Sequence, residues 1–334
     1  MAATSELWAG VGALIDAAPL EGVLAHKLGP LAAARLRAAG APLPEPLAAE
    51  ERAASFASLS AHALLQRIRE LGEGPIVVLK GPEVAALYPR NGRRFGDVDV
   101  LAPQAARLHR SLLEHGFREV DEIDRSEHHH LTPLRWPAVA LDVEVHASPN
   151  WPPGIPAPPL AEILEAAVPS VVGLDGLLAP ARQHHALLLA AHAWRHEPLE
   201  TLRDLLDVAL LAEAEPAAEL ERLASAWGLR RVWRTTRRAI DALFYGGPRP
   251  AALRVWARHL PAVRERTVFE SHLQAVLHPF WGYPPGRAVA ETAAALRTDL
   301  LPAPGEGWGV KLRRIPRAIR DARQPHDRRT GPGA

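Results

Sequence analysis

The pattern of hydrophobic and polar residues divides the chain into a helical start, a short mixed stretch and a long helical remainder. Residues 3–72 show helical periodicity, and their last predicted helix ends in a glycine-containing segment, residues 72–74. The pattern changes at Pro75, where the apolar, β-branched run PIVVLKG predicts a buried strand. From about residue 160 the helical pattern returns and continues to about residue 300.

Residues 75–154 carry short elements of both kinds. We predict a short helix over 82–89, a strand over 97–102 and a helix over 103–116. Three strands are expected next, within 117–123, 127–134 and 138–146. The proline-rich segment 148–159 predicts an extended connection without regular structure.

These elements predict an α+β fold, in which a small mixed β-sheet unit is flanked by N- and C-terminal α-helical regions. The expected boundaries are an N-terminal helical region (1–74), a sheet core (75–150), a C-terminal helical domain (151–310) and a basic tail (311–334).

Composition narrows the class of protein. The chain has 334 residues, of which 48% are hydrophobic and 23% charged, as in globular proteins. A net charge of +1 does not suggest a protein that binds nucleic acid through its overall electrostatic field. The absence of cysteine excludes disulfides, thiolate metal sites and a cysteine nucleophile. The N-terminus lacks the pattern of a signal peptide, and no apolar window is long enough to span a bilayer. We therefore expect a cytoplasmic protein without a membrane partner.

Two predicted strands carry acidic residues on one face. Asp97 and Asp99 alternate with valines, and so do Asp142, Glu144 and His146. Because alternate residues of a strand share a face, a mixed sheet could bring these two polar faces together. Several gathered carboxylates suit Mg²⁺, which prefers oxygen ligands, so metal ions would compensate their mutual repulsion. The alternative is a solvated sheet face with ordinary alternation of polar and apolar residues.

The order of four short elements resembles a known family. They are VVLKG, an arginine shortly before GDVDVL, a helix that ends in GF and the strand VEVH. This arrangement, over residues 75–147, resembles the uncharacterised bacterial nucleotidyltransferase family of the DNA polymerase β-like superfamily, with a looser likeness in the helices that follow. The resemblance implies a Mg²⁺-dependent enzyme that moves a nucleoside monophosphate from an NTP to a hydroxyl or similar acceptor and releases pyrophosphate. It also implies two Mg²⁺ ions, with Mn²⁺ as an alternative.

The resemblance assigns roles to individual residues. The catalytic and metal-binding set would be Asp97, Asp99 and Glu144. The nucleotide-binding set would be Lys80, Gly81, Arg93 and Arg94, although the superfamily more usually has Gly-Ser where Lys80 and Gly81 stand. Glycine lets a backbone approach phosphates closely, and the arginine fork suits phosphate oxygens. Both arginines could equally be solvated loop residues.

Five further residues are expected to contact substrate or to support the site. His146 follows the third acid on the same strand face, and His130 lies in the predicted strand EHHHLTPL. The family shows a helix that bears a histidine and a following helix similar to LRDLLD, so the resemblance implies that His192, Asp204 and Asp207 line the cleft from the helical side. Hydrogen-bonded strand histidines, helix capping and ion pairing are the alternative roles for these residues.

Two rival functions remain open at this point. One is a non-catalytic module that keeps the nucleotidyltransferase fold and binds a peptide or protein. The other is an enzyme that acts on nucleic acid through the basic tail, which the net charge disfavours. The acceptor also stays open among a small hydroxylated metabolite, an antibiotic, a modified peptide and a protein side chain.

Overall fold

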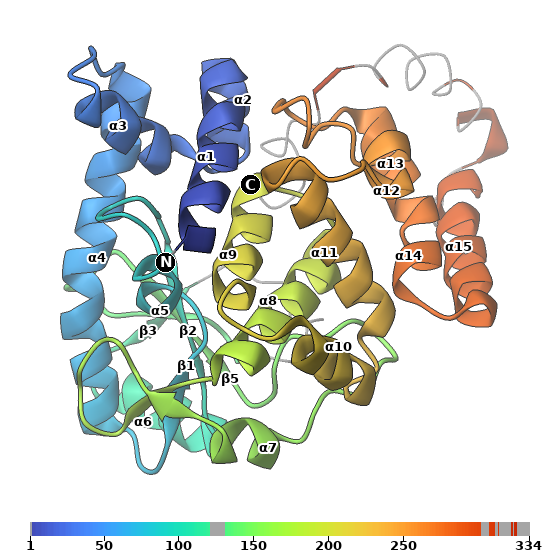
Figure 1. Ribbon diagram of the computed structural model, residues 1–334. Coiled ribbons are helices and arrows are strands. Elements are labelled where there is room, and N and C mark those ends of the chain that lie inside the picture. The colour runs from blue at the N-terminus through green and yellow to red at the C-terminus, as the bar shows by residue number, and fades with distance from the viewer. Residues whose placement is uncertain are drawn as a thin grey trace. The chain divides into compact units, whose positions relative to one another are not determined.

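The protein is described by a computed structural model that covers residues 2–120 and 131–301, together with 307–310, 313, 322, 324 and 325 (Figure 1). The chain forms two compact units. Unit 1 comprises residues 1–26, 196–206 and 229–334, and unit 2 comprises residues 27–195 and 207–228. Unit 2 contains the whole β-sheet.

The sheet has seven strands in the order β3-β4-β5-β2-β1-β7-β6. The bounds are β1 (Ile76–Val78), β2 (Asp97–Leu101), β3 (Arg118–Glu119), β4 (Leu134–Arg135), β5 (Asp142–His146), β6 (Val168–Pro169) and β7 (Leu177–Ala179). Strand β2 is antiparallel to β1 and parallel to β5, and β1 is parallel to β7. The sheet is therefore mixed, and the predicted α+β class is confirmed.

One face of the sheet packs on helices in a hydrophobic core. The valines of β2 and β5 are fully buried, and so are the inward residues of α4 (Glu45–Leu71) and α6 (Ala105–Glu114), such as Leu65 and Leu112. Helix α3 (Gly29–Ala38) packs on α4. Fully burying one such aliphatic side chain is worth about 1.5–3 kcal/mol. This core fixes the valine face of β2 and β5 inward and leaves the acidic face on the opposite side.

Helices make up most of the remaining structure. Unit 1 contains α1 (Ala2–Ala17), α2 (Leu20–Ala25), α11 (Arg230–Phe244), α12 (Ala251–Val255), α13 (Val268–Leu277), α14 (Pro279–Gly282) and α15 (Pro285–Leu300). Unit 2 adds α5 (Pro82–Ala85), α7 (Leu160–Glu165) and α10 (Ala217–Ala226), while α8 (Arg182–His196) and α9 (Leu202–Ala212) contribute residues to both units. No helix in the described part of the chain combines the length and apolar character that crossing a membrane would require.

The observed strands confirm most of the predicted ones and add two. Strands β1, β2 and β5 lie where the pattern places them, and β3 lies within the predicted strand 117–123. Strand β4 begins at Leu134, the last residue of the predicted strand 127–134, and residues 131–133 of that prediction are not strand, while residues 121–130 lie outside the described residues. The expectation that the chain is helical from about residue 160 is wrong at β6 and β7. Strand β7 extends the sheet beside β1 through the pair Ile76↔Leu177, because buried backbone groups at this edge need hydrogen-bond partners.

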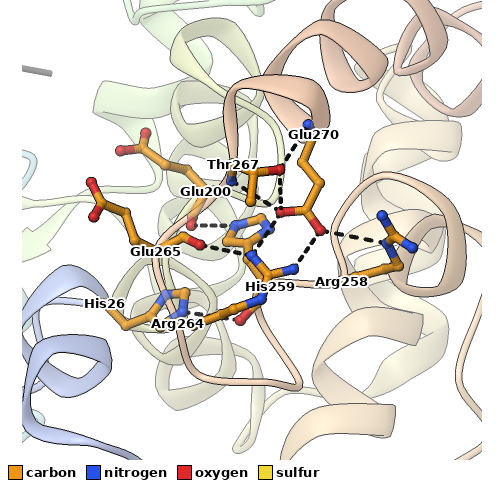
Figure 2. Close-up of polar contacts among 8 residues, drawn as sticks. All are labelled: His26, Glu200, Arg258, His259, Arg264, Glu265, Thr267 and Glu270. Atoms are coloured by element: carbon orange, nitrogen blue, oxygen red, sulfur yellow. Dashed lines mark hydrogen bonds and ion pairs between the residues drawn. The ribbon is translucent and has the colours of Figure 1, made fainter. Parts of the chain in front are cut away.

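Unit 1 contains a buried polar network (Figure 2). The rings of His26 and His259 are stacked with centroids 5.7 Å apart, and the ring N–H of His259 donates to Glu200 O at 3.0 Å. Glu270 is fully buried and accepts two hydrogen bonds from Arg264, at 2.8 and 2.6 Å. The network ties together three segments of unit 1 that are distant in sequence.

Candidate functional site

The two acidic strand faces meet as neighbours in the sheet. In the parallel register of β2 and β5, Asp97 pairs with Asp142 and Asp99 pairs with Glu144. Directly paired residues of neighbouring strands project to the same face. Asp99 is 2% exposed, whereas Asp97 and Glu144 are half-buried. The juxtaposition that the sequence pattern made possible is therefore present in the structure.

His146 completes the acidic cluster. Its ring Nε2–H donates to Asp99 Oδ1 at 3.0 Å, and Glu144 Oε2 lies 3.5 Å from the same nitrogen. Among the described residues, Asp99, Glu144 and His146 form the one group of three whose potential ligand atoms all lie within 4.8 Å of one another. Asp97, which the resemblance includes as a ligand, lies on the same strand face but is not a member of this group.

The chain itself supplies cations to this cluster. Burial alone would raise the pKa of Asp99, but the charge of Lys80 and the hydrogen bond from His146 outweigh it and hold this pKa below its usual range. Burial opposes protonation of His146, but hydrogen bonds to Asp99 and Glu144 raise the pKa of His146 to about 9. Lys80 and His146 therefore add positive charge beside the carboxylates, in addition to the metal ions that the sequence pattern predicts.

A tight turn carries Lys80 and Gly81 beside β2. The backbone N–H of Leu79 donates to Asp99 O at 2.9 Å, which continues the pairing of β1 with β2. Gly81 has φ +65° and ψ −118°, and a Cβ at this position would lie 3.3 Å from Asp97 O. Only glycine adopts this backbone conformation without strain and allows such close approach. The turn therefore lies against the strand that bears the acids.

Helix α8 holds this turn from the helical side. The ring N–H of His185 donates to Leu79 O at 2.5 Å, and Lys80 Nζ donates to His192 Nε2. Asn150 Nδ2 lies 3.5 Å from the other ring nitrogen of His192. His192, which was expected near the substrate, is thus brought to Lys80, 112 residues away in the sequence.

The two candidate arginines have carboxylate partners. The guanidinium of Arg93, expected at the phosphates, makes two hydrogen bonds to Asp207, at 2.8 and 2.7 Å. Its neighbour Arg94 is exposed and pairs with Glu50 at 2.6 Å. While the first pair holds, the Nε and Nη2 groups of Arg93 are engaged by the carboxylate rather than by phosphate oxygens.

The structure does not test two other expected residues, Asp204 and His130, against the acidic cluster. Asp204 belongs to unit 1, where its backbone N–H donates to Thr201 Oγ1 at 3.2 Å and its carboxylate pairs with Arg203 at 3.2 Å. His130 lies outside the described residues.

Sequence reasoning missed two polar residues near the turn. His185 lies in an apolar helical run, and a polar residue within such a run was the available signal. Asn150 lies in the proline-rich connection, where no periodicity marks it. His185 contacts Leu79 at the turn, and Asn150 contacts His192 on α8. Both partners are distant in sequence, so local pattern could not predict either contact.

The acidic cluster passes a simple test for a divalent cation. Asp99 Oδ2 is a buried carboxylate oxygen without a hydrogen-bond partner among the described residues. A buried acceptor of this kind ordinarily has a partner, and carboxylate oxygens are the preferred ligands of Mg²⁺. The donor set of Asp99 and Glu144, with Asp97 on the same face, therefore fits a hard divalent cation.

A comparison with protein-family models identifies the family of this chain. A model of the family described as uncharacterised nucleotidyltransferase matches residues 20–245, which is more than half of the chain. A structure of ANT(2″)-Ia in complex with adenylyl-2″-tobramycin shows 15% identity and a TM-score of 0.37, and the match covers 50% of this chain and 97% of that chain. A solution structure of the antibiotic-resistance factor ANT(2″)-Ia shows 12% identity and the same TM-score, 0.37, over 57% of this chain and 100% of that chain. A search of curated proteins finds no match.

Proposed function

We propose a reaction from the premise that this chain belongs to the uncharacterised nucleotidyltransferase family. The protein moves a nucleoside monophosphate from an NTP to a hydroxyl or similar group of a small molecule, peptide or protein. The acceptor oxygen bonds to the α-phosphorus, the bond from this phosphorus to the bridging oxygen of the β-phosphate breaks, and pyrophosphate leaves. The acceptor proton is released to solvent. The observation that carries the proposal is the pairing of Asp99 with Glu144 on adjacent parallel strands.

Asp99 and Glu144, with Asp97 beside them, would hold Mg²⁺, two ions as in other phosphoryl-transfer sites, or Mn²⁺ in its place. When bound, such ions neutralise charge on the phosphates and activate the attacking oxygen. His146 orients Asp99 by donating to its Oδ1, which leaves Oδ2 for the cation.

The turn at Lys80 and Gly81 would receive the phosphates. Lys80 presents a cation beside the acidic cluster, with its position fixed by His192. Gly81 allows a close backbone approach because it has no side chain. Arg94, whose side chain is 53% exposed, is proposed as an additional phosphate contact. We assign the reaction to the cytoplasm, which supplies NTPs and Mg²⁺.

Transfer of label tests this function. The folded protein is incubated with each of the four α-labelled NTPs and Mg²⁺ or Mn²⁺, with a cell extract as the source of acceptor. We expect one NTP to label a component of the extract and to release pyrophosphate, and Asp99→Asn to abolish both signals. If no NTP and neither metal gives label or pyrophosphate, the reaction is wrong, and the non-catalytic binding module becomes the better account.

A further inference from the structure

The pair formed by Arg93 and Asp207 is among the most buried charged contacts of unit 2. Arg93 Nε and Nη2 donate to Asp207 Oδ1 and Oδ2 at 2.8 and 2.7 Å, and the two side chains are only 4% and 7% exposed. The hydroxyl of Tyr88 donates to Asp207 Oδ1 at 2.6 Å. A two-pronged arginine–carboxylate pair fixes orientation as well as distance. Asp207 therefore holds two residues of one segment, Tyr88 and Arg93.

That segment leads directly into the acidic strand. Residues 86–96, between α5 and β2, contain turns but no helix or strand. Near its end, the backbone N–H of Asp142 donates to Gly96 O at 3.1 Å. The segment thus has an anchor on β5 and an anchor on α9, through Asp207, which is 114 residues away from Arg93. Without regular structure of its own, it depends on these contacts for its conformation.

The same segment also forms a wall of the turn at Gly81. A Cβ built on Gly81 would lie 3.5 Å from the ring of Phe95 and 3.3 Å from Asp97 O. Phe95 is buried and lies two residues after Arg93. A shift of the segment would therefore reach both the turn proposed to bind phosphates and the strand that begins at Asp97.

We propose that Asp207 is a positioning residue of the nucleotidyltransferase site. Through Arg93 and Tyr88 it sets the conformation of residues 86–96, and through them the distance between the Gly81 turn and the acidic strand. In this role the charge of Arg93 is neutralised by Asp207 and is not offered to the phosphates. The inference rests on the proposed function, because it concerns the geometry of that same site.

Nucleotide affinity distinguishes a positioning role from a phosphate contact. We would titrate ATP, GTP, CTP and UTP, each with saturating Mg²⁺, into the full chain by calorimetry, well below the melting temperature of every variant. The variants are Asp207→Asn, Arg93→Lys and their combination. We expect each single variant to weaken NTP binding by about tenfold, because small displacements at such sites are costly. The double variant should bind NTP no more weakly than the single variants do, because both substitutions break the same contact.

If Arg93 contacts phosphate instead, Asp207→Asn should not weaken NTP binding. If Arg93 binds phosphate, removing the charge of Asp207 releases the guanidinium, so Asp207→Asn would bind NTP as tightly as the unmodified chain, or more tightly. That result, or an unchanged affinity in both single variants, overturns the positioning role alone. If the unmodified chain binds none of the four NTPs with Mg²⁺, the proposed function fails and the positioning role fails with it.

Two further variants separate positioning from general stability. Tyr88→Phe removes one hydrogen bond to Asp207 and leaves the ion pair, so we expect a smaller loss of affinity in a folded protein. Glu51→Gln is the matched control, because Glu51 on α4 forms a similar two-pronged pair with Arg37 on α3, whose Nε and Nη2 donate to Glu51 Oε1 and Oε2, each at 2.7 Å. It should leave NTP affinity unchanged. Variants that lower the melting temperature without changing NTP affinity would show a merely structural role and overturn the proposal.

Discussion

At the scale of single residues, the balance of charge in the acidic cluster depends on two cations of the chain. Asp99 is buried, and a buried carboxylate is costly unless it is paired and hydrogen-bonded. His146 supplies the hydrogen bond and Lys80 supplies charge. The cluster is therefore a balanced arrangement that a metal and a nucleotide would have to rearrange together.

Glu144 and Asp142 offer a matched pair of substitutions on one strand face. Glu144 lies in the acidic cluster, whereas Asp142 is occupied by Arg135, at 2.7 and 2.9 Å. We expect Glu144→Gln to lower the rate of nucleotide transfer by at least about 100-fold, since metal ligands matter more than their supporting residues. Asp142→Asn should change the rate by less than about threefold, as expected for an exposed ion pair. Equal losses in a pyrophosphate-release assay would contradict the assignment of Glu144.

Gly81 should tolerate no side chain. Its φ of +65° and the nearby Asp97 O combine a backbone penalty with a close contact for any Cβ. We expect Gly81→Ala to reduce the free energy of unfolding by about 1–3 kcal/mol. Gly74→Ala is the control, because Gly74 also has a positive φ, +76°, but no atom of the described residues lies within 4 Å of the place its methyl group would take. A loss at Gly81 no larger than that at Gly74, in urea unfolding, would show that the contact does not matter.

At the scale of elements, local pattern predicts what lies along a strand but not what lies beside it. The alternation around Asp99 and Glu144 correctly placed each acid on a strand, opposite a valine face that is buried against α4 and α6. The parallel register that pairs the two acids depends on contacts between distant segments. For the same reason the pattern could not reveal that Arg93 meets Asp207.

Short strands were the other failure of local pattern. Strands β6 and β7 have two and three residues, too few to show a period against the surrounding helical sequence. Their strand conformation is set by pairing with each other and with β1. The long helices, in contrast, carry many turns of periodic sequence, and their existence was predicted correctly.

The buried network of unit 1 predicts sensitivity to acid (Figure 2). Burial lowers the pKa of His26 to about 4 and, together with the charge of Arg266, that of His259 to about 3. Because the unfolded chain takes up these protons near pH 6.5, stability is lost as the pH falls below this value. At pH 5 each histidine should cost about 2 kcal/mol of unfolding free energy relative to neutral pH. Urea unfolding at pH 7.5 and pH 5 measures this loss.

Replacing one histidine tests the cause of the acid sensitivity. His26→Gln keeps an N–H that can donate to His259 O, the present acceptor of the His26 ring at 3.3 Å, but it cannot take up a proton. The loss between pH 7.5 and pH 5 should shrink by about 2 kcal/mol. The control is His62→Gln, at an exposed position of α4. An unchanged pH dependence in His26→Gln would show that other groups cause the sensitivity.

At the scale of the whole molecule, the sheet and its helices carry the proposed nucleotidyltransferase site within unit 2. Its acids, its turn and its supporting helices come from segments as far apart as residues 80 and 207. Because these segments come together only in the folded chain, a ligand that contacts several of them binds the folded state and not the unfolded state. Such a ligand should raise the free energy of unfolding. Ligand binding can therefore be followed by melting before the acceptor is known.

Mg²⁺ and NTP should stabilise the protein more together than separately. Mg²⁺ alone must compete with Lys80 and the protonated His146 for Asp99, and NTP alone brings phosphates towards the carboxylates. Together they neutralise each other, so their binding should be coupled positively and reciprocally. At about 100 times its Kd the pair should add about 2.7 kcal/mol of stability, a shift of a few degrees in melting temperature for a chain of this length.

Thermal shift measurements with Mg²⁺, with each NTP and with both test this coupling. The shift with both ligands should exceed the sum of the separate shifts, and Glu144→Gln should reduce the excess because it removes one carboxylate of the cluster. Asp142→Asn, whose carboxylate is paired with Arg135, should retain the excess. Purely additive shifts with every NTP would mean that metal and nucleotide do not share a site, and the acidic cluster would then be a structural arrangement stabilised by Lys80 and His146 alone.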